Sequence, residues 1–437
     1  MATPRGQPHE TDSVQHPGLG LAIYGELAAF LRSRLPAPID GEVKELMSKR
    51  TADFIIIGGG LYGCATAYHL ARLGAGRVLV LERGAICSGG TARSCAIIRT
   101  HYSVTSNLLH AVESLKIFSH FDEIVGGDVG FRRTGYLIVG PEEHREPMLR
   151  VFRTQNEHGI DTAILSPEEA REVHPLLSFH DVGVIGYDTM TGYADPHLTV
   201  QAYARRAREL GARILTDTPV TGLSLAGAVK QVQTPAGDFE SPTVILAAGP
   251  WTNQILAGTG IRLPYVVSRH KVITLKTQRP YDPHWPTVKD LTTPDKIYFR
   301  PETGGVVLVG TGDHGEPVED PDVMQDPVDL AHVERISGLI SNRMPAFAEA
   351  EYTSGWTGPY DITPDWNPLL GPVPGYEGLH VMVGFSGHGF KLAPTISEAM
   401  AQMLVGERPR LPIDMYCVDR FQQGRALHGA YGIGSIS

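Results

Sequence analysis

Three glycines near the start of the chain have the spacing of a dinucleotide-binding turn. The pattern G-x-G-x-x-G begins at Gly58, directly after the apolar run Phe54–Ile57. Gly58 permits a tight turn, Gly60 leaves the backbone open to a pyrophosphate, and Gly63 lets a helix pack closely on a strand. Leu61–Leu73 then carries apolar residues at helical intervals, and the start of this helix would offer free N–H groups to phosphates.

An acidic residue closes the same unit. Val78–Leu81 is a second apolar run, and Glu82 follows it about 20 residues beyond the glycines, where a carboxylate accepts both ribose hydroxyls. Because a carboxylate would repel a 2′-phosphate, NADP is disfavoured. The glycine pattern recurs at Gly310–Gly315, but the residues that follow, Glu-Pro-Val-Glu-Asp-Pro-Asp, cannot open a helix. We therefore interpret the second copy as a strand end and a loop.

A glycine-rich turn near the C-terminus is the second candidate for chemistry. The segment Gly384–Pro394 joins an apolar strand, His380–Gly384, to a helix that we expect at Ala393–Leu404 with Pro394 in its first turn. The alternating glycines let backbone approach a flat ring. The start of the helix supplies a partial positive charge, which in a flavoprotein belongs beside the ring edge where negative charge collects on reduction.

These two turns need a sheet and helices to hold them. We predict an α/β fold, in which a Rossmann-type FAD-binding domain carries an inserted antiparallel-sheet (α+β) substrate domain. The inserted sheet is expected to contain Val266–Lys276, Lys296–Arg300 and Val306–Val309, with one helix, Leu330–Met344. By residue number, the FAD-binding domain comprises 51–140, 188–262 and 353–437, and the substrate-binding domain comprises 141–187 and 263–352. Further helices are expected at Thr105–Ile124, Glu142–Gly159 and Pro196–Leu210, and further strands at Thr134–Val139 and Val244–Ala248.

Composition and charge restrict the classes of function. The 437 residues carry a formal charge of −10, with 42% hydrophobic and 20% charged residues, as in a soluble globular protein. The negative charge argues against nucleic acid as a partner. The four cysteines show no C-x-x-C spacing, so we expect neither a disulfide framework nor a metal site, and we expect a reducing, cytoplasmic setting. A run of about 18 apolar residues is missing, so no membrane span is expected.

The first 50 residues are an N-terminal extension. Residues 1–17 are polar and contain Pro and Gly, and Leu19–Leu35 has the pattern of an amphipathic helix. Its charged residues and the lack of a small-residue cleavage site argue against a signal peptide. We expect this helix to dock on its own protein or on a partner subunit, and association with a membrane surface is the alternative.

Five further motifs carry a resemblance to a known family. They are Gly90-Thr91-Ala92-Arg93 with Ile97-Ile98-Arg99, Ala194-Asp195-Pro196, Ala247-Ala248-Gly249-Pro250-Trp251, Gly355–Asp365, and Asp419-Arg420-Phe421 with Gly424-Arg425. Together with the two turns, they resemble the D-amino-acid-oxidase (DAO) superfamily of FAD enzymes, from about Ala52 to Arg425. The likeness is strongest to the branch of sarcosine oxidase, sarcosine dehydrogenase and dimethylglycine dehydrogenase.

The resemblance implies a set of residues for the cofactor. FAD is expected to contact Gly58, Gly60, Leu61, Tyr62, Gly63, Glu82, Arg83, Gly90, Thr91, Ala92, Arg93, Val220, Ala248, Gly249, Trp251, Gly358, Gly387, His388, Gly389, Phe390 and Lys391. Members of the branch often tether the flavin through a cysteine or a histidine. Gly358 stands where the cysteine would be, and Ala92 stands near the position of the histidine. We therefore predict non-covalent FAD.

The resemblance also implies residues for a small amino-acid substrate. Arg99 and Lys391 stand where such enzymes hold the carboxylate of the substrate, and a buried carboxylate needs paired cationic donors. Tyr298 is expected to line the same pocket, and His101 and His388 are candidates for tuning proton movement.

Several functions are compatible with these residues. We expect FAD-dependent oxidation of a small secondary or N-methylated amino acid at its C–N bond, with hydride passing to flavin N5 and the imine hydrolysing in water. The alternatives are a D-amino-acid or proline-type dehydrogenase and an FAD-carrying subunit that serves assembly or regulation of a larger complex. A pyridine-nucleotide disulfide reductase would need a redox cysteine pair, which the sequence lacks.

The electron acceptor and the oligomeric state stay open at this point. The monomeric oxidases of the branch keep an oxygen-activating lysine on a strand that resembles Val306–Gly310, and this run has no lysine. The acceptor is therefore O2 or another carrier. The chain is compatible with a homo-oligomer or a hetero-oligomer, and no motif in the inserted sheet fixes the exact substrate.

Overall fold

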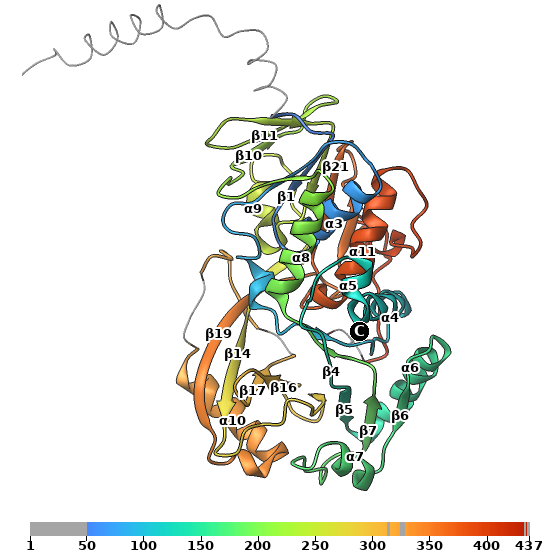
Figure 1. The fold of residues 1–437 in the computed structure, drawn as a ribbon, viewed down its shortest axis with the longest axis vertical. Helices are drawn as coiled ribbons and strands as arrows, with labels where there is room; N and C mark the ends of the chain where they lie inside the picture. The colour runs from blue at the N-terminus through green and yellow to red at the C-terminus, as the bar shows by residue number, and fades with distance from the viewer. Residues whose placement is uncertain (1–49, 313–314, 324–327, 432–433, 435–437) are drawn as a thin grey trace, which may run out of the picture. The chain divides into compact units, whose positions relative to one another are not determined.

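The computed structural model describes residues 50–312, 315–323, 328–431 and 434. From Thr51 onward the chain forms one compact unit. The predicted helix Leu19–Leu35 lies outside the described residues. A six-stranded sheet and a nine-stranded sheet organise the compact unit, and they occupy different ends of its ribbon in Figure 1. Among the described helices, none has both the length and the apolar composition that crossing a membrane demands.

The six-stranded sheet is parallel except at one edge. It contains β1 (Phe54–Ile57), β2 (Val78–Leu81), β9 (Arg213–Leu215), β13 (Thr243–Leu246), β20 (Leu369–Pro372) and β21 (Leu379–Val383). The strands lie in the order β20, β21, β13, β1, β2, β9, and β20 pairs antiparallel with β21. Every residue of β1 and β2 is buried, as a sheet covered on both faces requires.

Two different layers cover the faces of this sheet. Phe54 and Ile56 pack in one apolar core with three helices, whereas Ile55 and Ile57 pack in a second core with residues of a small antiparallel sheet. The two layers lie on opposite sides of β1 and β21 in Figure 1. The helices are α3 (Leu61–Arg72), α8 (Pro196–Glu209) and α11 (Gly389–Leu404), and the small sheet is β10 (Gly222–Ser224), β11 (Lys230–Gln233) and β12 (Phe239–Ser241).

The nine-stranded sheet is mostly antiparallel, as the sequence predicts for the substrate layer. It contains β5 (Tyr136–Gly140), β6 (Thr162–Ile164), β7 (Val184–Asp188), β14 (Val266–Lys276), β15 (Thr287–Asp290), β16 (Tyr298–Glu302), β17 (Val306–Gly310), β18 (Glu316–Pro317) and β19 (Glu351–Ile362). The order is β18, β14, β17, β16, β15, β5, β7, β6, with β19 on β14. The pair of β5 and β15 is parallel.

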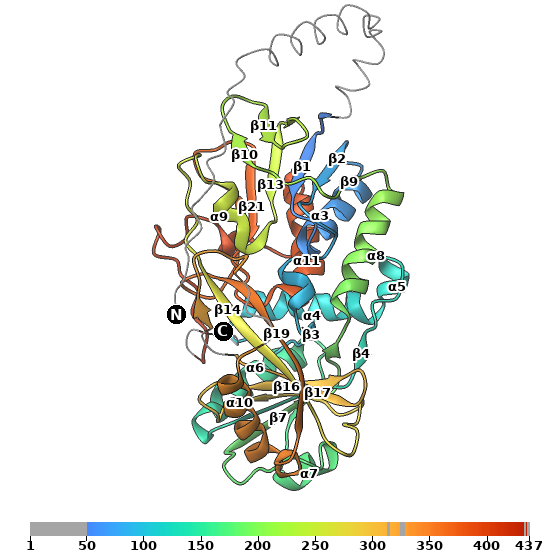
Figure 2. The ribbon, with the colours of Figure 1, turned by 90° about the vertical axis from the view of Figure 1, so that its left-hand side faces the viewer.

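Each face of the nine-stranded sheet has its own role. Val288, Phe299 and Val307 lie in one apolar core with residues of helix α10 (Leu330–Arg343), which covers that face (Figure 2). Successive residues of a strand point to opposite faces, so Lys289 and Tyr298, which are cross-strand partners, point away from α10. The long strands β14 and β19 extend from this sheet toward the six-stranded sheet in Figure 2.

Shorter elements connect the two sheets. The further helices are α4 (Thr105–Ser119), α5 (Phe121–Ile124), α6 (Arg145–Glu157), α7 (Pro167–Val173) and α9 (Thr252–Ile255), and 3-10 turns lie at Gly90–Arg93, Glu142–His144, Gly249–Trp251, Pro345–Phe347 and Asp414–Tyr416. A three-stranded sheet joins β3 (Ile97–Ile98), β8 (Gly192–Tyr193) and β4 (Arg132–Arg133). The helix predicted at Thr105–Ile124 is in fact divided at His120, which has φ −129° and ψ 35°.

The start of α11 differs from the prediction. The helix begins at Gly389, and Pro394 lies inside it, so the prediction of Pro394 in the first turn is wrong. The prediction used the preference of proline for a first turn. Helical backbone instead starts at the last glycine of the turn, and Pro394 leaves the carbonyl of Phe390 without a helical N–H donor.

Sheet membership changes near the predicted domain borders. β5, at residues 136–140, pairs with β7 and β15 of the nine-stranded sheet, although the prediction counted these residues with the FAD-binding domain. β19 starts at Glu351 and pairs with β14 as far as Ile362. The borders themselves stay a prediction, and the pairing assigns both strands to the substrate layer.

Candidate functional site

A cavity of about 400 Å³ lies at the carboxyl ends of the parallel strands, where ligands of such sheets bind. Ile57, Leu81 and Ala247, at or just after the ends of three strands, are part of its lining. Both predicted glycine-rich turns contribute. Of the residues predicted to contact FAD, the lining contains Gly58, Gly60, Leu61, Tyr62, Glu82, Arg83, Gly90, Thr91, Arg93, Val220, Ala248, Gly249, Trp251, Gly358, Gly387, Gly389 and Phe390.

Four of the predicted cofactor residues are not in this lining. A Cβ at Gly63 would lie 1.9 Å from the carbonyl oxygen of Gly58, so this glycine serves the packing of helix on strand. Ala92 belongs to the 3-10 turn beside the cavity. His388 and Lys391 line a second, smaller cavity instead.

The first turn offers backbone N–H groups to the large cavity. Gly58 has φ +116°, and a Cβ there would lie 2.5 Å from the carbonyl oxygen of Ala247. Gly60 is the N-cap of α3, whose first turn has no acidic residue. The N–H of Leu61 donates to Thr91 Oγ1 at 3.3 Å. This cradle of backbone and the positive end of α3 fit the pyrophosphate of a dinucleotide.

Glu82 is fixed beside the same turn. Its carboxylate accepts hydrogen bonds from the N–H of Gly59 at 2.6 Å and of Gly84 at 2.8 Å. An ionised carboxylate has about four acceptor positions, so both oxygens keep capacity for further donors. Glu82 also lines the cavity, where it can accept the hydroxyls of a ribose.

The second turn is held rigidly at the opposite side of the cavity. Tyr62 stacks on Phe385 with ring centres 3.8 Å apart and donates its hydroxyl to the carbonyl of Gly389 at 2.8 Å. The carboxylate of Asp361 accepts from the N–H of Gly384 at 2.7 Å, and burial raises the pKa of Asp361 to about 6. The first turn of α11 has no acidic residue, so its positive end suits the electron-rich edge of a flavin. The residues of the large cavity therefore fit FAD.

The loop after β18 of the nine-stranded sheet, which contains Asp320 and Asp322, touches the rim of this cavity. Arg83 binds both carboxylate oxygens of Asp322, at 2.6 and 3.0 Å, and lies over the ring of Trp251 at 4.4 Å. The indole of Trp251 donates to the same carboxylate at 2.9 Å, and Gln254 donates to Asp320 at 3.1 Å. Since Arg83, Trp251 and Gln254 all line the cavity, the loop is fastened across its edge.

The smaller cavity, of about 70 Å³, adjoins the large one. Ser94, Tyr360, Gly387 and Phe390 line both cavities, so the two spaces share a wall at the glycine-rich turn. The rest of its lining is Cys95, Ala96, Ile97, Arg99, Tyr136, Lys289, Tyr298, Thr311, Gly312, His388 and Lys391. The structure thus brings Arg99, Tyr298, His388 and Lys391 together at one cavity.

Two buried cations dominate the smaller cavity. Arg99, directly after β3, is 6% exposed, and Lys391, in the first turn of α11, is 7% exposed. Arg99 donates to the carbonyl of His101 and lies 4.1 Å from the centre of the Tyr102 ring. Burial and the nearby charge of Arg99 hold the pKa of Lys391 well below its ordinary value. Lys391 has no hydrogen bond or ion pair with any described residue, so the cavity suits a carboxylate.

Tyr298 reaches this cavity because a glycine lies opposite it. A Cβ at Gly310 would lie 2.3 Å from the Tyr298 ring, and Gly310 is the cross-strand partner of Tyr298. The Tyr298 hydroxyl lies 3.3 Å from Cys95 Sγ. β17 ends at Gly310, and Thr311 and Gly312 are not helical. As far as the chain is described, the second glycine pattern is a strand end, as interpreted.

The two predicted histidines have different positions. His388 lines the cavity, neither ring nitrogen has a partner among the described residues, and burial together with Arg99 holds its pKa well below the ordinary value. His101 does not line the cavity. Its Nε2 lies 2.9 Å from the hydroxyl of Tyr431, and burial lowers its pKa to about 3. The contact of His101 with a lining residue is through its backbone carbonyl, which accepts from Arg99.

Sequence reasoning missed two lining residues whose side chains can take part in binding or catalysis. Lys289 lies in β15, a strand that the sequence analysis did not predict, and Tyr360 lies in the wall between the cavities. Tyr360 was within a quoted motif, so its position could have been weighed. Lys289 is followed directly by Asp290 in the segment Thr287–Leu291, so no local apolar pattern could have identified it.

Comparisons with known proteins agree with this site. A family described as FAD dependent oxidoreductase (DAO) matches residues 53–403. Human mitochondrial sarcosine dehydrogenase is 27% identical over 393 residues, which cover 86% of this chain and 42% of that protein. The beta subunit of sarcosine oxidase from Arthrobacter sp. is 28% identical over 396 residues, which cover 88% of this chain and 95% of that subunit. The chain thus spans less than half the length of the human relative.

Solved structures extend the likeness to the fold. L-proline dehydrogenase from P. horikoshii superimposes with a TM-score of 0.78 at 28% identity, covering 86% of this chain and 99% of that one. Glycine oxidase from Geobacillus kaustophilus superimposes with a TM-score of 0.73 at 22% identity, covering 85% and 99%, and shows the shared fold alone. The predicted α/β fold and the resemblance are therefore confirmed, and the chain belongs to the DAO family of FAD-dependent oxidoreductases.

Proposed function

We propose that the protein uses FAD to oxidise the C–N bond of a small secondary or N-methylated amino acid. One observation carries the proposal: the cavity of Arg99 and Lys391 shares a wall with the cavity that fits FAD. The names of the relatives support it, since sarcosine dehydrogenase and sarcosine oxidase beta act on an N-methylated amino acid by name. The likeness to L-proline dehydrogenase keeps a ring-shaped secondary amine among the candidates.

The side chains of the smaller cavity divide the work of binding. Arg99 and Lys391 receive the carboxylate of the substrate and fix its orientation. The same two cations lower the pKa of the bound amine, so the neutral form that reacts is favoured. Tyr298 and Tyr360 close the sides of the cavity and exclude water. FAD, when bound, supplies the hydride acceptor, and the imine product hydrolyses after it leaves.

Non-covalent attachment of FAD is part of the proposal. Gly358 lines the large cavity, and a Cβ there would lie 3.3 Å from Arg93 Cβ, so this position carries no group that could form a bond to flavin. Ala92 likewise offers no nucleophile. Denaturation by trichloroacetic acid should release all the flavin into the supernatant, and flavin that stays with the precipitate would contradict this part.

A non-catalytic role is the second candidate. The regulatory subunit of mouse mitochondrial pyruvate dehydrogenase phosphatase is 27% identical over 371 residues, which cover 81% of this chain and 41% of that subunit. The buried cations of the smaller cavity favour an enzyme, because a carrier of FAD has no need of a carboxylate site.

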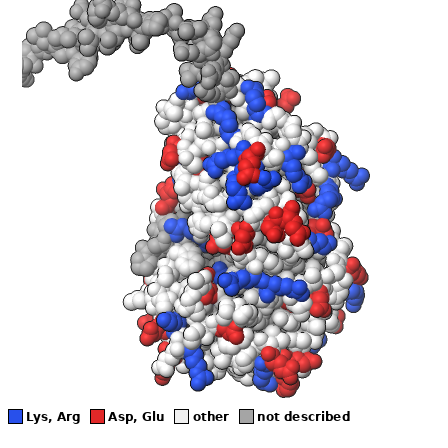
Figure 3. All heavy atoms as spheres, in the orientation of Figure 1, with Lys and Arg blue, Asp and Glu red and all other residues white. Residues whose placement is uncertain are grey.

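The cytoplasmic setting of the protein stays a prediction. On the face in Figure 3, Lys and Arg are interspersed with Asp and Glu, which suits a small-molecule substrate better than nucleic acid.

A substrate screen in the absence of air tests the proposal. The holoenzyme is mixed anaerobically with sarcosine, dimethylglycine, proline and D-amino acids, and the loss of oxidised flavin absorbance is followed. Reduction by at least one N-substituted amino acid is expected, and reduction by none would contradict the proposed function. Admission of O2 and measurement of peroxide then distinguish O2 from another carrier as the electron acceptor.

A further inference from the structure

The proposed reaction makes no use of one buried acid in the lining of the large cavity. Asp361 lies in β19, one residue before the end of the strand. It is 6% exposed and lines the cavity that fits FAD, and its neighbour Tyr360 borders the smaller cavity as well. Glu82, which suits the ribose of the adenosine half, lies beside the first glycine-rich turn, whereas Asp361 contacts the second. Asp361 therefore lies at the part of the cavity that suits the flavin ring.

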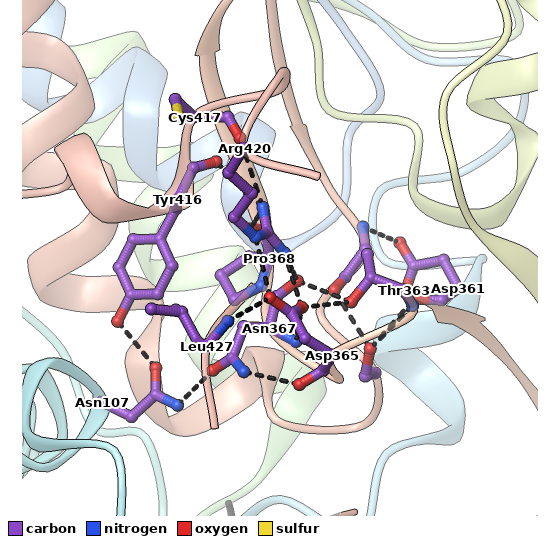
Figure 4. Close-up of polar contacts among 12 residues, drawn as sticks. Asn107, Asp361, Thr363, Asp365, Asn367, Pro368, Tyr416, Cys417, Arg420 and Leu427 are labelled. Carbon is purple, nitrogen blue, oxygen red and sulfur yellow. Dashed lines mark hydrogen bonds and ion pairs between the residues drawn. The ribbon is translucent and has the colours of Figure 1, made fainter. Parts of the chain in front are cut away.

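The charge of Asp361 is not balanced by a cation in the described part of the chain. Its carboxylate accepts from the N–H of Gly384 at 2.7 Å, and its backbone carbonyl accepts from the N–H of Ser386 at 3.2 Å. It has no ion pair with any described residue. Asp365, on the loop that follows β19, instead accepts two hydrogen bonds from Arg420 (Figure 4). Asp361 thus brings a negative charge to the wall of the cofactor cavity.

A negative charge at this wall opposes the reduction of a flavin. Two electrons and one proton convert oxidised FAD to its anionic reduced form, in which the added charge collects on the ring. The positive end of α11 stabilises that charge. The first turn of α11 has no acidic residue, but the carboxylate of Asp361 holds the turn that leads into this helix. Because like charges repel strongly at a site of low dielectric constant, Asp361 acts against the helix.

We propose that Asp361 lowers the reduction potential of the bound flavin. A lower potential makes the reduced flavin a stronger electron donor to the acceptor that reoxidises it. The inference requires FAD in the large cavity and is independent of the amine that is oxidised, so a failed substrate screen would leave it standing. Asp361 also shapes the turn through Gly384, and the experiment must separate its charge from this structural contact.

An amide in place of the carboxylate separates the two roles. Asp361→Asn keeps an oxygen that can accept the N–H of Gly384 but removes the charge. The FAD-loaded proteins are reduced stepwise with dithionite without air, together with a reference dye, and the ratio of reduced to oxidised flavin is read at a fixed state of the dye. At pH 8 we expect this ratio to be at least about tenfold higher in Asp361→Asn than in wild type.

Asp188 provides a matched control for the loss of a buried acid. It is 2% exposed, and burial raises its pKa to about 6, as it does for Asp361. Asp188 lines neither cavity. The ratio in Asp188→Asn should therefore stay within about twofold of wild type.

The pH dependence of the difference identifies the charge as its cause. Burial raises the pKa of Asp361 to about 6, so the carboxylate is charged above this pH and neutral below it. The difference between wild type and Asp361→Asn should be full at pH 8 and should shrink to less than about threefold at pH 5. Tyr62 and Tyr265 are the described titratable groups that interact with Asp361, and burial raises the pKa of both, so they stay neutral over this range.

A second neutral variant covers the case in which Asp361→Asn fails to fold. Asp361→Ser carries a hydroxyl oxygen that can also accept from Gly384, and it should shift the ratio in the same direction, with the same convergence at pH 5. Equal ratios in wild type and the neutral variants at pH 8 would overturn the inference. A difference of the same size at pH 5 and pH 8, or failure of both variants to fold around FAD, would assign Asp361 to the structure of the turn and would also overturn it. A wild-type protein that does not bind FAD would overturn this inference and the proposed function together.

Discussion

Arg420 and Lys391 are both buried cations, but their surroundings are opposite. Arg420 is 0% exposed, and Nε and Nη2 donate to the two carboxylate oxygens of Asp365 at 2.9 and 2.7 Å. Its remaining donors reach the carbonyls of Pro368 and Asn367 (Figure 4). Lys391 is 7% exposed and has no ion pair with a described residue. A buried cation with a complete set of acceptors stabilises the fold, whereas one that faces a cavity whose described lining holds no Asp or Glu is available for a ligand.

The network around Arg420 explains one of the family motifs. Asp365 also accepts from the N–H of Leu427 at 2.9 Å, and Asn367 accepts from Asn107 at 2.6 Å. These bonds fasten the C-terminal segment and α4 to the loop that follows β19 (Figure 4). The motif that begins at Asp419 therefore serves the fold, whereas Arg99 and Lys391 line the smaller cavity.

One substitution made at both cations should separate their roles most strongly. Arg420→Met is expected to lower the free energy of unfolding by about 3–5 kcal/mol, because it leaves the buried carboxylate of Asp365 without its partner. Lys391→Met removes a buried charge, so the free energy of unfolding should stay within about 1 kcal/mol of wild type or rise. Urea unfolding at one saturating FAD concentration measures both. Equal losses would remove the distinction between the two cations.

A substitution of Arg99 tests whether a cation of the smaller cavity binds the substrate. Arg99→Ala should raise the half-saturating substrate concentration by about ten- to hundredfold, because a charged hydrogen bond to the carboxylate is lost. The flavin content should stay that of wild type. Lys116, an exposed cation paired with Glu113 on α4, gives the control Lys116→Ala. Unchanged saturation in Arg99→Ala would contradict its role as a carboxylate partner.

The pH dependence of binding should differ from that of an ordinary lysine. Burial and Arg99 lower the pKa of Lys391 in the free enzyme, so its charged form is lost at a lower pH than usual. Because the carboxylate binds the charged form, affinity should fall as pH rises through this lowered pKa. Dissociation constants of methoxyacetate, the ether analogue of sarcosine, measured over the whole pH range in which the protein stays folded, test the effect. Lys391→Met should abolish this part of the profile, and a persistent profile would assign it to another group.

The smallest effect concerns the loop on the rim of the FAD cavity. Asp322→Asn weakens the pair with Arg83, which is 2.6 Å long and about half exposed at both partners, so we expect FAD to dissociate only about two- to fivefold faster. Glu142→Gln, which removes an exposed pair with Arg145 away from both cavities, is the matched control. Release of FAD into excess apo-acceptor protein gives the rate. Equal rates in the two variants would show that the loop does not retain the cofactor.

Local patterns predicted much of this molecule. The β1–α3–β2 unit, the buried strands and the strand Val266–Lys276 follow from periodicity and glycine spacing, because these features depend on neighbouring residues. Arg99 and Lys391 were predicted through motifs of a family whose fold brings them together. The register that turns Tyr298 toward the cavity over Gly310 depends on pairing between strands, which no local pattern specifies.

The features that the sequence did not predict are long-range. β15 was missed because Thr287–Asp290 places Lys289 and Asp290 next to each other, and adjacent charges are unusual in a buried strand. The buried Asp290 accepts from Thr292, and its ionic partner is Arg343 of α10, whose guanidinium lies 2.7 Å from it. The contact of Asp322 with Arg83 joins residues far apart in the chain, so it too became visible only in the structure.

The most direct test of the central claim is the binding of methoxyacetate to the oxidised holoenzyme, followed through the flavin spectrum, in wild type and in Lys391→Met. The account predicts a saturable spectral change in wild type and an affinity at least about tenfold lower in the variant. A wild-type spectrum that does not respond, or equal affinities in the two proteins, would contradict the claim that Lys391 and Arg99 present a carboxylate site to the flavin.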